Sequence, residues 1–203
     1  MSSFAVTPAE GEAHPMSQDR KVKIGMLFYV LADAAFVVFL LVSYIWERAY
    51  NTGGGWFNFK GMALPDEATS NLLLALIVLS AVAYAVAHMG IRAGNQGVLR
   101  VGLAISLVLV IVTLVWQVRF MGQQQFSTQD GTFASSWIML NGYHVYHLAI
   151  GIFLGLALTI RAFAGKYTTE RHLGLVTVGY FWYWMALMPV LMWLMMLFFP
   201  AKL

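Results

Sequence analysis

Long apolar segments separated by short polar ones dominate the pattern of this chain. Five segments each hold roughly 20 mostly apolar residues, the length that an α-helix needs to cross about 30 Å of hydrocarbon. The apolar residues are consecutive and do not alternate with polar ones, so the pattern predicts helices and not the strands of a membrane barrel. The predicted fold is therefore all-α, an integral membrane bundle of five transmembrane helices. The predicted spans are residues 24–46, 71–91, 98–118, 135–160 and 173–199.

Composition narrows the class of protein further. Hydrophobic residues make up 60% of the 203 residues and charged residues 10%, whereas an average soluble domain carries about 25% charged residues. One soluble core of this size cannot bury so many apolar residues, which excludes an ordinary globular protein. The absence of cysteine excludes disulfides, iron–sulfur clusters and thiolate metal sites. The net charge of +3 is spread along the chain, without the dense Lys/Arg run that indicates nucleic-acid binding.

The chain divides into a polar tail and a membrane domain. Residues 1–22 are polar and lack the apolar core of a cleaved signal peptide, so we expect a retained cytoplasmic tail. Residues 23–203 form the expected membrane domain. Its connections are short except residues 47–70, whose glycines indicate a surface excursion with a short interfacial helix around Trp56 and Phe57.

Lysine and arginine are distributed unequally between the two sides of the predicted bundle. The basic residues on the side of the N-terminus are Arg20, Lys21, Lys23, Arg92, Arg100, Arg161, Lys166 and Arg171. Those on the other side are Arg48, Lys60, Arg119 and Lys202. Because positive residues favour the cytoplasmic side, we expect a cytoplasmic N-terminus and, after five spans, an outside C-terminus. The expected location is a bacterial-type inner membrane.

Asp33 is the residue whose position most requires an explanation. It lies well inside the first predicted span, near the membrane midplane, and is the only carboxylate within any predicted span. An unpaired aspartate there costs roughly 3 kcal/mol on insertion scales, so intramembrane carboxylates generally have a function. We expect a proton site, or a carboxylate that polarises the water chain of a neighbouring subunit. The alternative is a protonated carboxyl that is hydrogen-bonded to a nearby helix.

His144 and His147 are the second candidates for chemistry. Their i, i+3 spacing is expected to place both rings on one face of the fourth helix, where they could ligate a metal or one could bind haem. A metal would need a third ligand, and Asp33 is the only carboxylate at that depth. A bis-histidine haem would need a histidine at matching depth, but His88 and His172 lie near the cytoplasmic ends of their helices. Packing and hydrogen bonds between helices are the favoured roles, and we expect this chain to bind no metal and no cofactor.

Small residues indicate close packing of the fourth helix. Gly151 and Gly155 form a G-x-x-x-G motif, and Gly142 lies on a nearby face. Such residues let helices approach closely in lipid, so we expect a packing role for all three. Intramembrane polar groups are few, and the chain lacks a Walker loop, a nucleophile elbow and a metalloprotease helix. The chain by itself is therefore too poor in such groups for a transporter or a redox enzyme.

Several short motifs occur together in one order and spacing. Their residues are Gly25, Met26, Ala32, Asp33 and Phe36 in the first span, Asn71 and His88 in the second, Gln117 in the third, then Phe126 and residues 130–135, 142–151, 171–174 and 181–183. In this order and five-helix context they resemble subunit III of the haem–copper respiratory oxidases, over about residues 22–200. That family occurs in seven-helix and five-helix versions, and this chain is similar to the five-helix version.

The resemblance implies a role as well as a fold. It implies a non-catalytic subunit of a proton-pumping terminal oxidase that passes electrons from cytochrome c or quinol to O2 in aerobic respiration. Such a subunit packs beside catalytic subunit I, which holds the haem and copper, binds phospholipid between its helices and supports proton uptake. Asp33 stands where the family has its carbodiimide-reactive carboxylate. The residues implied for a structural polar network are His88, Gln117, His144, His147 and His172. Membership of a larger respiratory supercomplex stays open.

Four positions depart from the family pattern. Val176 replaces a glutamate at the start of the last helix, Tyr183 and Ala186 replace its His and Asp, and Phe120 replaces a glutamate in the third helix. The polar network of the last helix is therefore expected to be largely absent. Aspartate in place of glutamate in the first span is more typical of relatives of quinol oxidases and nitric oxide reductases. The alternatives to an oxidase subunit III are an accessory protein of a nitric oxide reductase, a small haem-binding membrane cytochrome and a transporter.

Overall fold

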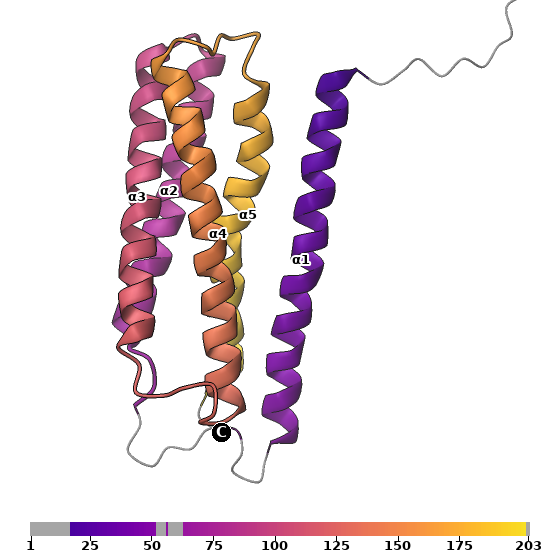
Figure 1. Ribbon diagram of the computed structural model, residues 1–203, viewed down its shortest axis with the longest axis vertical. Helices are drawn as coiled ribbons and strands as arrows, with labels where there is room; N and C mark the ends of the chain where they lie inside the picture. Colours follow the sequence, from indigo (N-terminus) through magenta and orange to yellow (C-terminus); the bar gives the residue numbers. More distant parts are fainter. Residues whose placement is uncertain (1–16, 52–55, 57–62, 202–203) are drawn as a thin grey trace, which may run out of the picture.

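The computed structural model describes residues 17–51, 56 and 63–201 and contains five long helices in this part of the chain. They are α1 (Gln18–Tyr50), α2 (Glu67–Arg92), α3 (Gln96–Gly122), α4 (Thr132–Phe163) and α5 (Leu173–Phe198). Figure 1 shows them running side by side along the long axis of the molecule. All five are long and apolar enough to cross a membrane, and the described residues contain no strand. The predicted five-helix bundle is confirmed, and the chain is a multi-pass membrane protein.

Helices α1 to α4 extend beyond the predicted spans, most of all at the start of α1, whereas α5 begins at the predicted residue and ends one residue before its predicted end. Hydropathy identifies the segment that lies in hydrocarbon, whereas polar residues continue α1 to α4 into the interface. The ends are defined by local chemistry: the Asp66 carboxylate accepts a hydrogen bond from the Thr69 N–H at the start of α2. Gly94 and Gly165 follow α2 and α4 at φ angles of 75° and 67°, which glycine adopts without strain and which end a helix.

Four of the helices form a closed ring. Helix α2 packs against α3 and α5, and α4 packs against the same two helices. The contact between α2 and α3 is close, because a Cβ atom on Gly102 would lie 2.8 Å from the Ala87 Cβ and 3.0 Å from the Ala83 carbonyl. In the described part of the chain α1 packs only against α4 and α5, and Figure 1 shows it outside the ring.

The fully buried residues of helix α1 lie in its C-terminal half. Its buried residues are Val37, Leu40 and Tyr44, and residues 18–36 include none. The Tyr44 hydroxyl donates to the Phe199 carbonyl at 3.1 Å, which ties α1 to the end of α5. In Figure 1 the ribbon of α1 lies farther from the ring towards its N-terminus. Side chains of this half still reach the ring, since Met26 packs against its core and the Tyr29 ring lies 6.2 Å from that of Phe181.

Trp56 closes the end of the bundle where α1 and α5 finish. Its side chain is buried, its Nε1 donates to the Ala201 carbonyl at 2.8 Å, and its own carbonyl accepts the Phe133 N–H at the start of α4. The interfacial helix expected around this residue also involves Phe57, which lies outside the described residues. Residues 1–16 of the expected cytoplasmic tail lie outside them as well.

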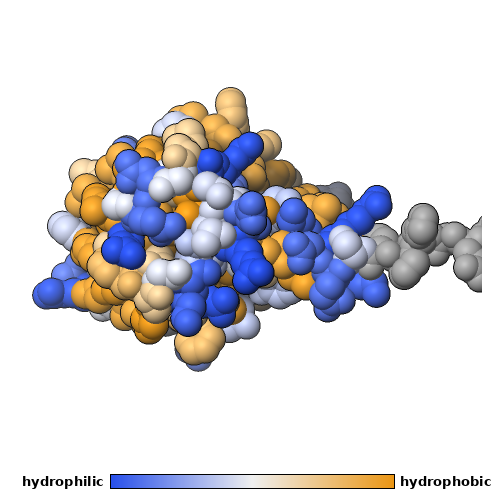
Figure 2. Space-filling view, turned by 90° about the horizontal axis from the view of Figure 1, so that it is seen from above, coloured by the Kyte–Doolittle hydropathy of each residue, from blue (hydrophilic) through white to orange (hydrophobic). Residues whose placement is uncertain are grey.

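The surface is polar at its ends and apolar along its sides. Figure 2 views the end where α2 joins α3 and α4 joins α5; hydrophilic residues gather there and hydrophobic ones surround them. Large apolar side chains such as Phe28, Ile105 and Phe153 are exposed on α1, α3 and α4. Exposed apolar surface of this extent is unusual for a monomer in water, and it suits a bundle whose sides face lipid.

Candidate functional site

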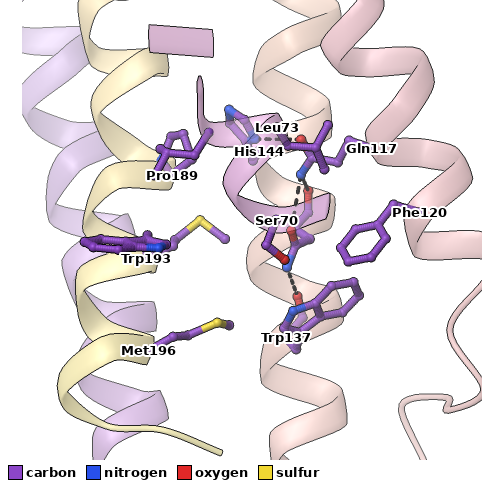
Figure 3. A pocket seen from close by; sticks show the side chains of 12 residues that line it. Ser70, Leu73, Gln117, Phe120, Trp137, His144, Pro189, Trp193 and Met196 are labelled. Carbon is purple, nitrogen blue, oxygen red and sulfur yellow. Dashed lines mark hydrogen bonds between the residues drawn. The ribbon is translucent and has the colours of Figure 1, made fainter. Parts of the chain in front are cut away.

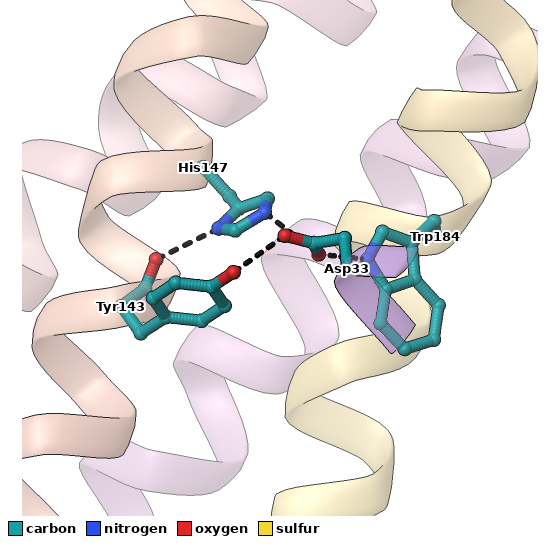
Figure 4. A network of polar contacts seen from close by, with 4 residues as sticks. All are labelled: Asp33, Tyr143, His147 and Trp184. Carbon is teal, nitrogen blue, oxygen red and sulfur yellow. Dashed lines mark hydrogen bonds and ion pairs between the residues drawn. The ribbon is translucent and has the colours of Figure 1, made fainter. Parts of the chain in front are cut away.

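Asp33 lies at the middle of α1 and faces α4 and α5. Its Oδ2 is 3.0 Å from the His147 Nε2 of α4 and accepts a hydrogen bond from the Trp184 Nε1 of α5 at 2.6 Å. Its Oδ1 accepts a hydrogen bond from the Tyr143 hydroxyl at 2.5 Å. Figure 4 shows the carboxyl group between these three side chains. Since only 9% of the Asp33 side chain is exposed, three helices enclose a titratable group at membrane depth.

The hydrogen-bond partners fix how many protons the Asp33–His147 pair holds. His147 Nδ1 lies 2.9 Å from the Tyr143 carbonyl, which only accepts, so Nδ1 carries a hydrogen. The short contact between Nε2 and Asp33 Oδ2 then requires one proton between them. This proton makes either an imidazolium with a carboxylate or a neutral imidazole with a carboxylic acid, and the pair is neutral overall in both arrangements. The Tyr143 hydroxyl and the Trp184 N–H both donate to the oxygens of this carboxyl group.

Local packing holds these rings in place. Tyr143 and His147 are four residues apart on α4 and therefore lie on one face of the helix. The Phe181 ring of α5 stacks on the His147 imidazole with centroids 5.8 Å apart and an interplanar angle of 15°. Phe36 of α1 lies against Tyr143, with ring centroids 5.0 Å apart. The site is thus surrounded by aromatic rings from all three helices that supply its polar groups.

His144 belongs to a different set of contacts. Its Nδ1 lies 3.0 Å from the Gln117 Oε1 of α3, and the Gln117 Nε2 reaches the Asn141 Oδ1 at 3.3 Å. The Asn141 Nδ2 in turn donates to the Trp137 carbonyl at 2.9 Å. The rings of His144 and His147, which the spacing had placed on one face, therefore bond to different helices: His147 to α1 and His144 to α3.

The direction of every hydrogen bond in this second network is fixed. The Trp137 carbonyl only accepts, so the Asn141 amide must donate to it and present Oδ1 to Gln117. Gln117 must then donate with Nε2 and accept with Oε1, and His144 must donate with Nδ1. The network thereby selects the tautomer of His144 in which Nδ1 carries the hydrogen. Unlike the Asp33 pair, it contains no proton shared between two titratable groups.

A cavity of about 80 Å³ lies beside this network in the centre of the four-helix ring. Figure 3 shows Trp193 and Pro189 of α5 on one side and Gln117 and Phe120 of α3 on the other. Its polar lining comes from Ser70, Gln117, Asn141 and His144. The cavity occupies the half of the ring nearest the end of α5.

His88 and His172 form a pair apart from both networks. Their ring centroids lie 6.0 Å apart, at the end of α2 and the start of α5. His172 Nδ1 lies 3.2 Å from the Thr168 carbonyl in the preceding loop. Both side chains are half-buried. The structure therefore does not bring them together with Gln117, His144 and His147 in one network.

The three predicted packing glycines differ in their surroundings. A Cβ atom on Gly151 would lie 2.6 Å from the Met185 Sδ, and one on Gly155 would lie 2.9 Å from the Trp182 Cη2. Both glycines thus allow α4 to approach α5. A Cβ atom on Gly142 would have no neighbour within 4 Å among the described residues. The close approach therefore involves Gly151 and Gly155 and not Gly142.

The positions that depart from the family pattern carry no acid or histidine into the site. Phe120 and Ala186 are buried among apolar residues, and Tyr183 is partly exposed on α5. Val176 lies in the first turns of α5. Helix α5 instead contributes the Trp184 indole to Asp33. Sequence reasoning missed both Trp184 and the Tyr143 hydroxyl as partners; the i, i+4 spacing to His147 could have suggested Tyr143, but no local signal marks Trp184.

No group of three or more His, Cys, Asp or Glu side chains that could hold a metal ion occurs among the described residues. His147 uses both ring nitrogens in hydrogen bonds, to Asp33 and to a backbone carbonyl. His144 uses Nδ1. Both ring nitrogens of the histidine beside Asp33 are thus engaged by other groups of the protein.

Comparison with known proteins identifies the family of this chain. The family model described as "Cytochrome c oxidase subunit III" matches residues 6–201. The chain is 27% identical over 184 residues to a "Probable cytochrome c oxidase subunit 3" of Rickettsia prowazekii (strain Madrid E), with 84% of this chain and 66% of that protein covered. It is 22% identical over 192 residues to "Cytochrome c oxidase subunit 3" of Pylaiella littoralis, with 91% and 70% covered. The chain spans about two thirds of the length of these relatives. The match over nearly its whole length shows that the chain belongs to the cytochrome c oxidase subunit III family.

Proposed function

We propose that this chain is the non-catalytic subunit III of a proton-pumping haem–copper terminal oxidase, which takes electrons from cytochrome c or a quinol, and that it supports proton uptake through Asp33. The observation that carries the proposal is the Asp33–His147 pair at the middle of α1, in which Nε2 lies 3.0 Å from Oδ2. Membership of a subunit III family supports a complex with other oxidase subunits. We place catalytic subunit I, with the haem and copper, next to this chain.

The pair suits temporary storage of a proton. Moving the proton between Oδ2 and Nε2 changes no net charge, so it avoids the desolvation penalty of an isolated ion in a medium of low dielectric. When the proton leaves for a neighbouring subunit, the pair becomes an anion, and the Tyr143 and Trp184 donors stabilise it. The next proton restores the neutral pair. Asp33 and His147 thus hold the proton, and the two donors limit the cost of releasing it.

Substitutions of Asp33 within the purified complex test this role. Asp33→Asn keeps the shape and one acceptor but cannot share a proton with His147, so we expect slower proton uptake and faster loss of activity during turnover. Asp33→Glu restores the carboxylate and should recover part of both. The matched control is Glu47→Gln, the same chemical change near the end of α1. The proposed role is wrong if Asp33→Asn equals the wild type in both measurements.

Phospholipid is the proposed ligand of the exposed face of the N-terminal half of α1. Leu27, Phe28 and Leu31 are exposed there at 47%, 67% and 54%. Acyl chains can cover this apolar face. Native mass spectrometry of the complex should detect retained phospholipid, and Phe28→Ser should reduce it while Phe153→Ser on α4 should not. Equal retention in the two variants would contradict this placement.

The proposed orientation places the N-terminus in the cytoplasm of a bacterial-type cell. Arg92, Arg161 and Arg171 lie at the end of the bundle shown in Figure 2, in agreement with a cytoplasmic location of that end. Because the chain has no cysteine, single cysteines report on topology without background. Thr169→Cys should react with a membrane-impermeant reagent only from the cytoplasmic side, and Gln129→Cys only from outside. The reverse pattern would invert the orientation.

Purification in mild detergent through a tag on this chain tests the oxidase partner directly. A co-purifying catalytic subunit with haem absorption and copper would support the proposal. A chain that purifies alone and colourless would reject it and favour a transporter. A chain that is alone but carries a haem spectrum would indicate a small cytochrome.

A further inference from the structure

The outer side of α4 carries a row of residues that the described part of the chain does not bury. They recur at alternating spacings of three and four residues: Met139, Gly142, Tyr146, Ala149, Phe153 and Leu156. Met139, Tyr146 and Phe153 are exposed at 53%, 57% and 74%. Such a spacing places residues along one stripe of a helix, and membrane helices that cross at a small angle meet through stripes of this kind. We call this stripe the outer row of α4.

Tyr146 places a hydroxyl group of this row deep in the membrane. It lies near the middle of α4, more than about 20 Å from either end of the helix at 1.5 Å per residue. The hydrocarbon extends about 15 Å from its midplane, which is farther than a tyrosine side chain can reach from there. The hydroxyl has no hydrogen-bond partner among the described residues, and an O–H group without an acceptor is costly in hydrocarbon. The acceptor therefore has to come from another molecule.

Three kinds of neighbour can cover the outer row, and they differ in what they offer this hydroxyl. Lipid acyl chains carry no hydrogen-bond acceptor. A second copy of this chain, packed symmetrically, brings Tyr146 against Tyr146, and only one of the two O–H groups can then donate to the other. The other side chains of the row contain no oxygen or nitrogen. A membrane-spanning helix of a different protein, with an acceptor at this depth, satisfies the hydroxyl completely.

Gly142 agrees with a helix at this place. A Cβ atom on Gly142 would have no neighbour within 4 Å in the described chain, so its missing side chain serves no contact inside the bundle. Gly142 lies one turn before Tyr146 and Ala149 lies one turn after it, and small residues let the backbone of a neighbouring helix approach closely. The ring between them is supported by Tyr143, whose ring centroid lies 6.3 Å away.

We propose that the outer row of α4 binds a membrane-spanning helix of another subunit of the oxidase complex, and that this helix accepts a hydrogen bond from the Tyr146 hydroxyl. The inference rests on the proposed oxidase complex and is independent of proton transfer by Asp33. Because the Tyr146 ring centroid lies 5.5 Å from that of His147, the partner helix packs beside the Asp33–His147 pair. The contact thus brings a second subunit close to the group that is proposed to exchange protons with it.

Photo-crosslinking of the complete complex in its native membrane tests the contact. Replacement of Phe153 by p-benzoylphenylalanine puts a photoreactive aromatic group in the outer row, and a sample kept in the dark is the control. We expect irradiation to join this position to a peptide from a membrane-spanning segment of another oxidase subunit, identified by mass spectrometry. Adducts with phospholipid alone, or with a second copy of this chain, would overturn the proposal. Failure of the oxidase role is distinguishable, because the tagged chain then purifies without other subunits.

Tyr146→Phe tests the hydrogen bond, since it removes the donor and keeps the ring. We expect the variant chain to fold as the wild type does, because the hydroxyl has no partner within the described residues. Its association constant with the other subunits in mixed micelles should fall about two- to tenfold, the contribution of one hydrogen bond. Tyr180→Phe, at an exposed position near the start of α5, is the matched control and should leave association unchanged. Equal association in Tyr146→Phe and the wild type would show that the partner accepts no bond from this hydroxyl.

Gly142→Leu tests the close approach of the two helices. We expect this variant to weaken association more than Tyr146→Phe does, because a bulky side chain keeps the partner helix away from the outer row. Gly25→Leu on α1 is the matched control, since a Cβ atom on Gly25 likewise meets no described atom within 4 Å. Undiminished association in Gly142→Leu would mean that the partner helix packs elsewhere, and it would overturn the proposal.

Discussion

His144 and His147 lie three residues apart on α4, yet their environments differ. His147 contacts a carboxyl group from α1, and either group of this pair can carry the proton between them. His144 ends a chain of amide hydrogen bonds in which each donor is determined by a backbone carbonyl. The comparison shows that two histidines close together on one helix can differ in whether their partner is titratable.

The two networks also differ in what they hold together. The Asp33 network joins α1 to α4 and α5, and α1 has no other helix neighbours in the described part of the chain. The His144 network lies between α3 and α4, inside a ring that many apolar contacts also close. Loss of the Asp33 network should therefore loosen α1, which lies at the periphery. Loss of the His144 network should strain the contact between α3 and α4, but these two helices should stay packed.

Removal of the Asp33 carboxylate should have the largest effect. Asp33→Ala leaves the His147, Tyr143 and Trp184 donors facing no acceptor, and breaking a buried pair in this way costs roughly 3–5 kcal/mol. We expect a loss of this size in the free energy of unfolding, measured by denaturation in mixed micelles. His147→Ala should cost less once Asp33 is already alanine. If the two losses simply add, the residues do not act as a pair.

Interruption of the amide chain should have a smaller and purely structural effect. Gln117→Leu leaves the His144 Nδ1–H and the Asn141 Oδ1 without partners, which costs about 1–3 kcal/mol for buried polar groups. Proton uptake should not change, because Gln117 does not contact the Asp33 pair. Gln123→Leu, at the exposed end of α3, is the matched control. A slower proton uptake in Gln117→Leu would mean that the two networks are coupled.

Deletion of a single donor to Asp33 should have a smaller effect still. Tyr143→Phe keeps the ring but removes its hydroxyl, while the Trp184 N–H and His147 still serve the carboxyl group, so we expect a loss of about 0.5–1.5 kcal/mol. Tyr146→Phe, at a residue 57% exposed on α4, should leave stability unchanged. A loss as large as that of Asp33→Ala would show that the hydroxyl, and not the ion pair, holds α1.

The sequence predicted the membrane-spanning helices better than the hydrogen-bond partners of their polar side chains. Uninterrupted apolar runs identify five spans because lipid forces the backbone to satisfy its own hydrogen bonds. Asp33 is recognisable because a lone intramembrane carboxylate is costly. Its partner Trp184, however, lies 151 positions away in the chain, and no local pattern encodes which helix faces α1. The same holds for His144 and Gln117, whose pairing depends on the packing of α3 against α4.

The interpretation of the His144/His147 spacing shows where helical periodicity reaches its limit. Three residues advance a helix by about 300°, so the two side chains diverge by about 60°. That angle is small enough to suggest one face, yet large enough to direct the rings to neighbours on opposite sides. Gly142, nine residues before Gly151, likewise meets no neighbour within 4 Å, because a packing motif does not specify how far along the helix the contact extends.

An exposed carboxylate should matter least and should respond to pH in a simple way. Asp66 caps α2 and accepts hydrogen bonds from the Thr69 N–H at 2.8 Å and hydroxyl at 2.6 Å, and these bonds lower the pKa of its carboxyl. A carboxyl group whose pKa is lower in the folded chain than in the unfolded chain stabilises the fold above its unfolded-state pKa of about 3.9. This stabilisation is lost as the pH falls through the folded-state pKa. Asp66→Ala should thus lower Tm slightly at neutral pH, and thermal unfolding should show the difference vanish in acid. A difference that persists in acid would mean that the Asp66 cap acts through packing and not through its charge. Asp66 would then resemble the neutral amides around His144 and not the titratable Asp33.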